Sequence, residues 1–124
     1  MTSQSPGKLG WIDLTVEDAN ATSAFYSAVC GWTAAPHPMG DYNDFNMEAE
    51  DGSSVSGICH ARGMNANIPP VWMPYFLVPS LENALETVRA NGGTVLEDRS
   101  EGGGGGIAII RDPNGAHCAL WQAG

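Results

Sequence analysis

Basic residues are scarce in this chain of 124 amino acids. Five Lys and Arg residues stand against 14 Asp and Glu residues, which gives a formal net charge of −9. A surface of that sign repels the phosphates of nucleic acids and the headgroups of anionic lipids. The composition therefore argues against nucleic acid and membrane partners, and it is typical of a solvated surface that keeps a protein soluble.

Long apolar runs and paired cysteines are missing as well. No stretch approaches the roughly 20 residues of a membrane-spanning helix, and residues 1–6 lack the apolar core of a secretory signal. Cys30, Cys59 and Cys118 are odd in number, have no Cys-x-x-Cys spacing and stand among apolar or small neighbours. We expect buried, reduced thiols in a cytoplasmic protein, with a catalytic thiol at Cys59 as the open alternative.

Turn and cap signals, in contrast, are plentiful. Residues 112–115 read Asp-Pro-Asn-Gly, in which the proline presets φ and the Asn-Gly pair accepts the positive φ of a tight hairpin. An apolar run at 107–110 precedes this turn, and an alternating run at 117–122 follows it. Two strands are therefore expected to meet there.

The same order of elements is expected in both halves of the chain. The first half contains a strand over 10–16, a helix between Asp18 and Gly31, strands over 32–35, 41–48 and 54–60, and a loop over 37–40. After a connector over 63–70, the second half contains a strand over 72–78, a helix from Ser80 to the stop at 91–93, and strands over 94–96, 107–110 and 117–122.

A shift of 62 residues superposes these halves. It carries Val16 onto Val78 and the helix-ending Gly31 onto Gly93. A chain of this length has room for one core. We therefore predict an α+β fold in which two βαβββ modules make one pseudo-symmetric domain over residues 8–122, with module one at about 9–62 and module two at about 71–122.

Three motifs in each half identify a family. In the first half they are residues 11–18 (Trp-Ile-Asp-Leu-Thr-Val-Glu-Asp), 25–26 (Phe-Tyr) and 31–32 (Gly-Trp), and in the second half they are residues 72–76, 92–95 and 112–121. Nearly the whole chain thus resembles the vicinal oxygen chelate superfamily, which includes glyoxalase I, bleomycin-resistance proteins, extradiol dioxygenases and fosfomycin-resistance enzymes. The resemblance implies a glyoxalase-like fold, whose two curled sheets pair into a cup that holds a ligand and often a metal.

The usual metal ligands do not carry over from that resemblance. Metal-dependent members take a His, Gln or Glu from the first and last strand of each module, and these positions fall on Trp11, Met73, Ala119 and a site near Gly57. Trp and Ala cannot coordinate a divalent cation, and Met is too soft for Mg, Mn or Ni. We therefore expect no metal and no cofactor, and no standard machinery for isomerising thiohemiacetals or cleaving catechols.

Strand alternation selects the residues that face the cup. Because the apolar residues at 12, 14 and 16 must face the helix, Trp11 and Asp13 are expected inside the cup. Asp13 either hydrogen-bonds a backbone group or Tyr75, its mate under the 62-residue shift, or meets the ligand. The Ala119 assignment implies that the last strand turns residues 117 and 121 to the same face, away from residues 118 and 120.

Each of these candidates has a second interpretation. His117 is either a general base or ligand hydrogen-bonder, or a rim histidine without chemical duty. Trp72 and Trp121 are either aromatic walls or plain core. The candidate ligand-binding residues are Trp11, Asp13, Gly57, Cys59, Trp72, Met73, Tyr75, His117, Ala119 and Trp121.

The placement of the basic residues sets the expected ligand charge. None of Lys8, Arg62, Arg89, Arg99 and Arg111 is expected where it could grip an anionic ligand. With Asp13 and aromatic rings in the cup, the ligand is expected to be a neutral or cationic, partly aromatic small molecule. The glycines at 102–106 lack the Gly-Lys-Ser/Thr of a phosphate loop, and they form either a plain hairpin arm or a lid.

Three functional hypotheses follow. The first is a glyoxalase/bleomycin-resistance-type small-molecule-binding protein with an aromatic, weakly acidic cup. The alternative is a metal-independent lyase or isomerase, or a hydroxylase-associated enzyme, that uses Asp13, Tyr75 and His117 as acid/base groups. The third is a partner-binding module with a filled cup. A homodimer is also expected, because family members commonly pair and an uncovered sheet edge is a liability.

Overall fold

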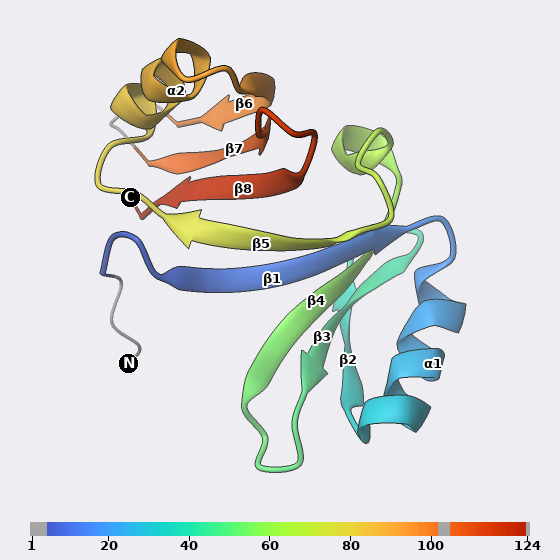
Figure 1. Cartoon of the computed structure of the whole chain (residues 1–124). Coiled ribbons are helices and arrows are strands. Elements are labelled where there is room, and N and C mark those ends of the chain that lie inside the picture. The colour runs from blue at the N-terminus through green and yellow to red at the C-terminus, as the bar shows by residue number, and fades with distance from the viewer. Residues whose placement is uncertain (1–4, 102–104, 124) are drawn as a thin grey trace. The chain divides into compact units, whose positions relative to one another are not determined.

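A computed structural model describes residues 5–101 and 105–123 of the chain (Figure 1). Within these residues there are eight strands, two α-helices and a short 3₁₀ segment. In chain order they are β1 (Leu9–Val16), α1 (Ala19–Cys30), β2 (Thr33–Pro38), β3 (Asn43–Glu48), β4 (Ser54–His60), the 3₁₀ segment Gly63–Asn65, β5 (Trp72–Leu77), α2 (Leu81–Ala90), β6 (Thr94–Ser100), β7 (Gly106–Arg111) and β8 (His117–Gln122).

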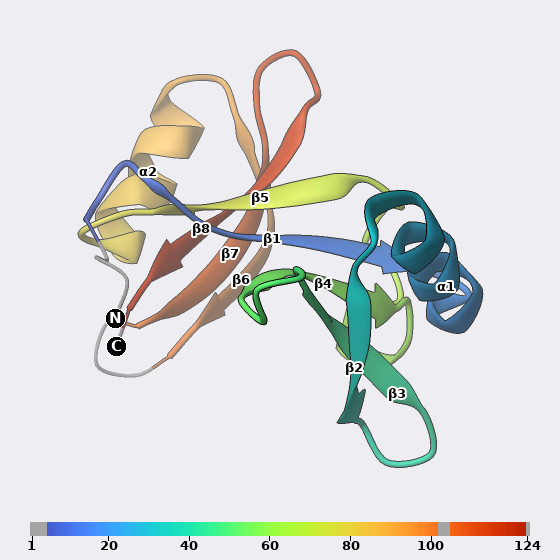
Figure 2. The same ribbon diagram turned by 90° about the horizontal axis from the view of Figure 1, so that it is seen from below.

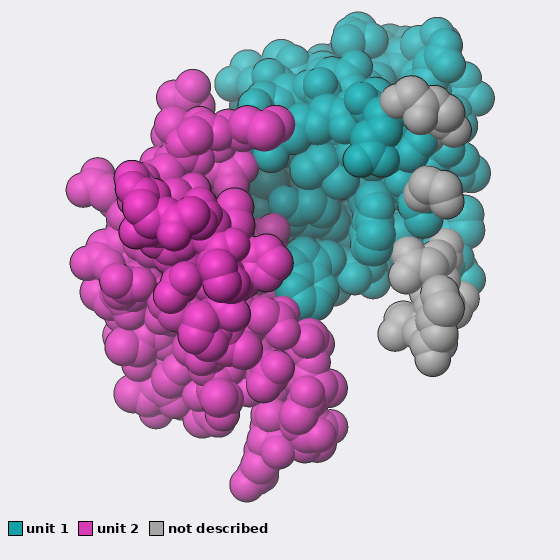
Figure 3. All heavy atoms as spheres, turned by 180° about the vertical axis from the view of Figure 1, so that it is seen from behind, with its two compact units in different colours: residues 1–11, 73–124 teal, residues 12–72 magenta. Residues whose placement is uncertain are grey.

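The chain divides into two compact units, which Figure 3 colours separately. One unit comprises Ile12–Trp72, and the other comprises Met73–Gly124 together with the residues up to Trp11. The expected order of elements in two βαβββ modules is confirmed, and the connector at 63–70 belongs to the first unit. We keep the names module one and module two for these units.

The sheet of module one has the order β2-β3-β4-β1 (Figure 2). β1 runs parallel to β4, with Asp13 opposite Gly57, and β3 is antiparallel to both β2 and β4. Its helix face carries a core of Leu14, Ala19, Met47 and Ile58. The rings of Tyr26 and Trp32 stack beside this core at a centroid distance of 6.0 Å, which fixes α1 to the sheet.

The sheet of module two repeats that topology as β5-β8-β7-β6. β5 runs parallel to β8, with Tyr75 opposite Ala119, and β7 is antiparallel to both β8 and β6. The helix face buries an apolar core contributed by α2, β7 and β8, whose members are Leu81, Leu85, Ala108, Ile110 and Leu120.

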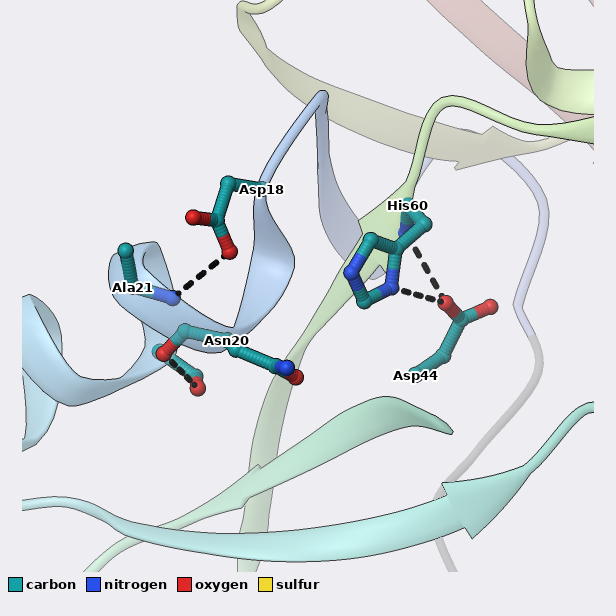
Figure 4. A network of polar contacts seen from close by, with 6 residues as sticks. Asp18, Asn20, Ala21, Asp44 and His60 are labelled. Atoms are coloured by element: carbon teal, nitrogen blue, oxygen red, sulfur yellow. Dashed lines mark hydrogen bonds and ion pairs between the residues drawn. The ribbon is translucent and has the colours of Figure 1, made fainter. Parts of the chain in front are cut away.

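The strand register confirms the internal repeat. Asp13 and Gly57 form the central parallel pair of module one, and the residues 62 positions later, Tyr75 and Ala119, form that of module two. Both helix N-caps obey the same shift. The carboxylate of Asp18 accepts the N–H of Ala21 at 3.0 Å (Figure 4), and the hydroxyl of Ser80 accepts the N–H of Asn83 at 3.2 Å.

The helix C-termini obey the shift less closely. Gly31 ends α1 in the left-handed conformation, with φ 73°. In module two the left-handed residue is Gly92, with φ 86°, and not Gly93. The hairpin at 112–115 shows a similar detail, because Gly115 alone takes a positive φ while the carboxylate of Asp112 accepts two backbone N–H groups of the turn.

Two strands are longer than their sequence pattern indicates. β2 continues through His37 and Pro38, which were expected in a loop, because an edge strand tolerates residues without an N–H. β6 runs to Ser100 and not to residue 96, because a bulge between Val95 and Glu97 interrupts its period of two. The proposed lid at 102–106 falls largely on residues 102–104, which lie outside the described residues.

Candidate functional site

Each module has a sheet face that its own helix does not cover, which we call the open face. In module one this face follows from the register. Asp13 is paired with Gly57 and Thr15 with Cys59, while Leu14, between them, belongs to the helix-side core. The expected orientation of Asp13 away from the helix is thus observed.

Asp44 joins this face from β3 and is the most constrained acidic side chain there. Only 6% of the residue is exposed. Its Oδ1 accepts the backbone N–H of His60 at 2.8 Å and lies 3.5 Å from the Nδ1 atom of the same residue (Figure 4). The β3–β4 pairing stops at Phe45 and Ile58, so a carboxylate serves the amide just beyond the end of the ladder.

Cys59 lies between the two acidic residues of this face. Burial, followed by the negative charges of Asp13 and Asp44 and a hydrogen bond to Asp44, raises the pKa of the Cys59 thiol to about 12. A thiol with such a pKa stays protonated at neutral pH and is a poor nucleophile. The geometry therefore disfavours the catalytic thiol that the sequence left open, and it makes Cys59 a hydrogen-bond donor.

Asp44 is a candidate that sequence reasoning missed. The signal was the alternation in residues 43–48, where Asp44 and Asn46 are polar while Phe45 and Met47 are apolar. Phe45 and Met47 belong to the helix-side core, so the polar pair has to face the other way. The open face of module one is therefore polar, and it includes Asp13, Thr15, Asp44, Asn46 and Cys59.

The open face of module two is mostly apolar. Tyr75 lies opposite Ala119 and Leu77 opposite Trp121, and β7 adds Ile107 and Ile109 through its pairing with β8. The expected split of β8 is observed, since Cys118 and Leu120 contact the core beneath α2. Met73 and Ala119 are both buried, and His117, in the same alternation, is half-buried.

The two tryptophans of the candidate set lie in different surroundings. Trp72 packs on the helix side of module one, where its Nε1–H donates to the hydroxyl of Tyr26 at 3.1 Å and its ring meets Trp32 edge-on. Its interpretation as core is therefore the one that its contacts support. Trp121 is on the open face, but the backbone at Gly10 packs against its ring. A Cβ added at Gly10 would come within 2.9 Å of that ring, so part of the indole is already covered.

Arg99 departs from the expected placement of the basic residues. It is paired with Ile107 across β6 and β7, and therefore shares the open face of module two. Its guanidinium donates to the carboxylate of Glu97 at 2.8 Å, and its side chain is mostly buried. Arg111, opposite His117, lies on the same face. The sequence pattern placed neither arginine there, and Glu97 offsets the charge of Arg99.

The residues at the family's metal positions do not fit a metal. The indole of Trp11 offers an N–H group, which does not ligate a metal, and Met73 offers a buried thioether. The side chains of Ala119 and Gly57 have no atom that could ligate a metal. Among residues 5–101 and 105–123, no group of three or more His, Cys, Asp or Glu side chains is arranged to hold a metal ion. No chemical step at these positions can therefore be assigned to a metal.

A groove of about 510 Å³ lies on the helix side of module two, away from the open face. It runs between α2 and the end of β6 and is lined by carboxylates and by Arg89, over an apolar base of Leu81 and Leu85. The side chains at its rim are solvent-exposed. In the described part of the chain, no helix is both long and apolar enough to cross a membrane.

Comparison with known proteins places these features in a family. A model of the glyoxalase-like domain matches residues 11–121. CFP32 of Mycobacterium tuberculosis (strain CDC 1551 / Oshkosh), a candidate glyoxylase by name, is 31% identical over 120 residues, which cover 94% of this chain and 46% of that protein. DnrV of Streptomyces peucetius, an anthracycline biosynthesis protein, is 29% identical over 137 residues, which cover 100% of this chain and 50% of that protein.

The chain thus spans about half the length of these relatives. Among solved structures, methylmalonyl-CoA epimerase from Mycobacterium tuberculosis superposes with a TM-score of 0.59 and 16% identity, covering 100% of this chain and 93% of that one. At this identity the likeness shows the fold alone. The match of the family model over residues 11–121 establishes that the chain belongs to the glyoxalase-like domain family.

Proposed function

We propose that this chain is a small-molecule-binding protein of the glyoxalase and bleomycin-resistance type, which holds its ligand on an open face without the family metal. The observation that carries the proposal is the contrast between those faces. Module one presents Asp13 and Asp44 around the Cys59 thiol. Module two presents Tyr75 and Trp121 beside aliphatic side chains. Fixed polar groups of the first kind and apolar walls of the second kind are both features of ligand sites.

The charges on these faces favour a neutral or cationic ligand. Asp44 is buried and held by hydrogen bonds, so its position is fixed before a ligand arrives. Of the two arginines that share the open face of module two, Arg99 is engaged by Glu97, and Arg111 lies opposite His117 at the end of β7. An aromatic ring such as Tyr75 adds about 0.5–2 kcal/mol of cation–π attraction if a cation lies over it. We therefore propose a partly aromatic ligand that carries no net negative charge.

A thermal-shift comparison of benzamidine with benzoate tests this proposal, because the two probes share a ring and differ in charge. We expect benzamidine to raise the melting temperature and benzoate to leave it unchanged. Asp13→Asn is expected to weaken the benzamidine response about tenfold in apparent Kd. Glu50→Gln, at an exposed turn, is the control for loss of one negative charge. A response to benzoate alone, unchanged in Asp13→Asn, would overturn the proposal.

Metal content is measured on the same samples. We expect less than a tenth of an equivalent of Zn, Ni, Mn or Fe in protein purified without chelator, since the four metal positions hold no suitable ligand. One equivalent of any of these metals, retained through gel filtration, would contradict the metal-free proposal.

An enzyme of the lyase or isomerase class is the second candidate, and one contact pattern favours it. Tyr75 lies opposite Ala119, and His117 is two residues earlier on the same face of β8. A phenol and an imidazole on such a diagonal are within reach of one ligand. If they act as acid and base, deuterium from D₂O should exchange into a bound carbon acid, and His117→Gln should stop the exchange without abolishing binding.

The cellular compartment is also part of the proposal. Cys30, Cys59 and Cys118 are all free thiols, which favours a reducing, cytoplasmic location. Localisation of the tagged full-length protein by fractionation measures this directly.

A further inference from the structure

The groove on the helix side of module two has no part in the proposed function, which assigns the ligand to an open face. Its volume of about 510 Å³ is within the roughly 300–1,000 Å³ of small-molecule sites. Leu81 and Leu85 of α2, both buried, form its base. The groove therefore has the size of a ligand site and an apolar surface within it, on a side of the sheet that the open face does not share.

The charged side chains of the groove are unbalanced. Four carboxylates line it, and Arg89 brings the one guanidinium of that lining. Among residues 5–101 and 105–123, the ion pairs are His60 with Asp44, Arg62 with Asp41 and Arg99 with Glu97, and none of them involves a carboxylate of the groove. The groove carboxylates are Glu82 and Glu86 of α2, Asp98 of β6, and Glu101 just after β6.

Two of these carboxylates are arranged so that they repel each other. Glu82 and Glu86 are four residues apart on α2, and like charges at this spacing destabilise a helix. On the other wall, the N–H and the hydroxyl of Ser100 donate to Oδ1 of Asp98 and hold that carboxylate in place. A cation bound between the walls would relieve the repulsion and would meet a carboxylate that is already positioned.

The equivalent positions of module one show that the fold does not require these charges. Asp98 pairs with Ala108 as Pro36 pairs with Phe45, so the two modules can be compared in this region residue by residue. Under the 62-residue shift, the five charged positions of the groove become Asn20, Ala24, Ser27, Pro36 and Met39. A helix is thus attached to the same kind of sheet without any of these charges. The acidity of the groove is a property of module two alone.

The N-terminus of α2 does not make this groove a site for an anion. A helix N-terminus attracts anions through its unpaired N–H groups. Here the hydroxyl of Ser80 accepts the N–H of Asn83 at 3.2 Å, and Oε1 of Gln122 accepts the N–H of Leu81 at 2.6 Å. Neutral acceptors of the groove lining therefore already occupy the positive end of the helix, and the remaining charge of the groove favours a cation.

The spacing of the carboxylates favours an elongated cation over a metal ion. In the part of the chain that the structure describes, no three His, Cys, Asp or Glu side chains are grouped closely enough to hold a metal. Glu82 and Glu86 are about 6 Å apart along the helix axis, at 1.5 Å per residue. Ammonium groups joined by three or four methylenes have a similar spacing, and the methylenes are apolar like the leucines between the walls.

We propose that the groove binds a linear aliphatic polyamine. Its methylenes lie on Leu81 and Leu85, as the stem of a lysine side chain covers an apolar surface. Its ammonium groups meet Glu82 and Glu86 on one side and Asp98 on the other. A basic peptide is a poorer occupant, because a helix in a groove needs apolar anchors at i, i+3, i+4 and i+7, and the base of this groove consists of two leucines.

Isothermal titration calorimetry with spermidine tests the proposal. Wild-type protein is expected to bind spermidine reversibly, with a Kd that rises with salt. The double variant Glu82→Gln/Glu86→Gln should raise the Kd about tenfold, because two exposed ion pairs are lost. Glu17→Gln/Glu50→Gln removes the same charge from exposed positions of module one, and it should leave the Kd unchanged.

Two-dimensional NMR locates the bound polyamine. Spermidine is expected to shift the backbone amides of α2 and of residues 98–101, and to leave those of Thr15 and Cys59 on the open face unchanged. The benzamidine response of Glu82→Gln/Glu86→Gln should equal that of wild type, so a failure at this groove is distinguishable from a failure on the open face. Absence of binding at millimolar spermidine, an equal loss of affinity in Glu17→Gln/Glu50→Gln, or shifts confined to the open face would overturn the proposal.

Discussion

The two modules share a backbone and distribute their polar residues in opposite ways. On the open face, Asp13, Thr15 and Cys59 of module one become Tyr75, Leu77 and Trp121 after the 62-residue shift. On the outer side of the helix the reverse holds, since the exposed Phe25 and Val29 of α1 become Thr87 and Asn91 at the end of α2. The open face is therefore polar in module one and apolar in module two. The outer side of the helix is apolar in module one and mostly polar in module two.

The β3 and β7 strands extend this contrast. Phe45 lies opposite Ile58, and Ala108 lies opposite Leu120, the mate of Ile58. The residue before each of these is Asp44 in module one and Ile107 in module two. Strand pairing and the helix-side cores maintain the fold in both modules, so the remaining faces were free to diverge. Functional residues are therefore best sought at the positions where the two modules differ.

The largest expected effect is on thiol chemistry. In the fold the pKa of Cys59 is raised from 9.0 to about 12, so its thiolate fraction at pH 8 should be about a thousandfold below that of an ordinary thiol. Timed alkylation with mass spectrometry should label exposed Cys30 first and Cys59 last. Cys118 of module two, whose pKa burial also raises, should lie between them.

The same pKa shift has a consequence for stability. A thiol whose pKa is higher in the folded state favours folding fully below pH 9, and this contribution is lost as the pH rises from 9 toward 12. Cys59→Ala should therefore flatten the alkaline loss of stability that urea unfolding records. Fast labelling of Cys59 in the native protein would show that its polar surroundings are wrongly assigned.

The second effect concerns Asp44. Asp44→Ala should lower the free energy of unfolding by about 3 kcal/mol, because it leaves the buried N–H of His60 without its acceptor. Asp44→Asn keeps an acceptor oxygen and should cost about 1 kcal/mol. Urea unfolding at pH 7 measures both. If Asp44→Leu, which copies the apolar character of module two, were as stable as wild type, the polar face of module one would have no structural role.

The smallest effect separates the two helix-ending glycines. Gly93→Ala should cost about 2 kcal/mol, because its Cβ would lie 2.8 Å from a methyl carbon of Val88 and 3.0 Å from the carbonyl oxygen of Arg111. Gly31→Ala should cost about 1 kcal/mol, through the positive φ alone. Gly31→Asn should recover part of that loss, since Asn tolerates this conformation, whereas Gly93→Asn should not. Thermal unfolding of the four variants tests whether Gly31 is needed for its positive φ and Gly93 for its close contacts.

The repeat and its topology were accessible from the sequence because local signals set them. Asp18 and Ser80 mark helix starts, and each βαβββ set is bounded by turn residues. β6 was truncated in the prediction because its bulge and the charged residues 97–99 break the alternation that identifies a strand.

The candidate site was less accessible, for a physical reason. Alternation placed Asp13 and His117 correctly with respect to the helices, because one apolar face determines the other. It did not identify Asp44, whose importance comes from a hydrogen bond to His60, 16 residues away in sequence. It also did not place Arg99 on the open face, because the bulge shifts the parity of β6. Long-range contacts of this kind carry no local signal.

The position of β8 within its sheet governs the order of events during synthesis. β8 is made last of the four strands of module two, yet it lies between β5 and β7. Until residue 122 has left the ribosome, β5 lacks its parallel partner, and β8 is not there to join the β6–β7 hairpin to β5. Residues 9–60 already contain every strand of the other sheet. We therefore expect the nascent chain to complete the sheet of module one while the sheet of module two still lacks β8, which leaves the apolar residues of module two within reach of chaperones.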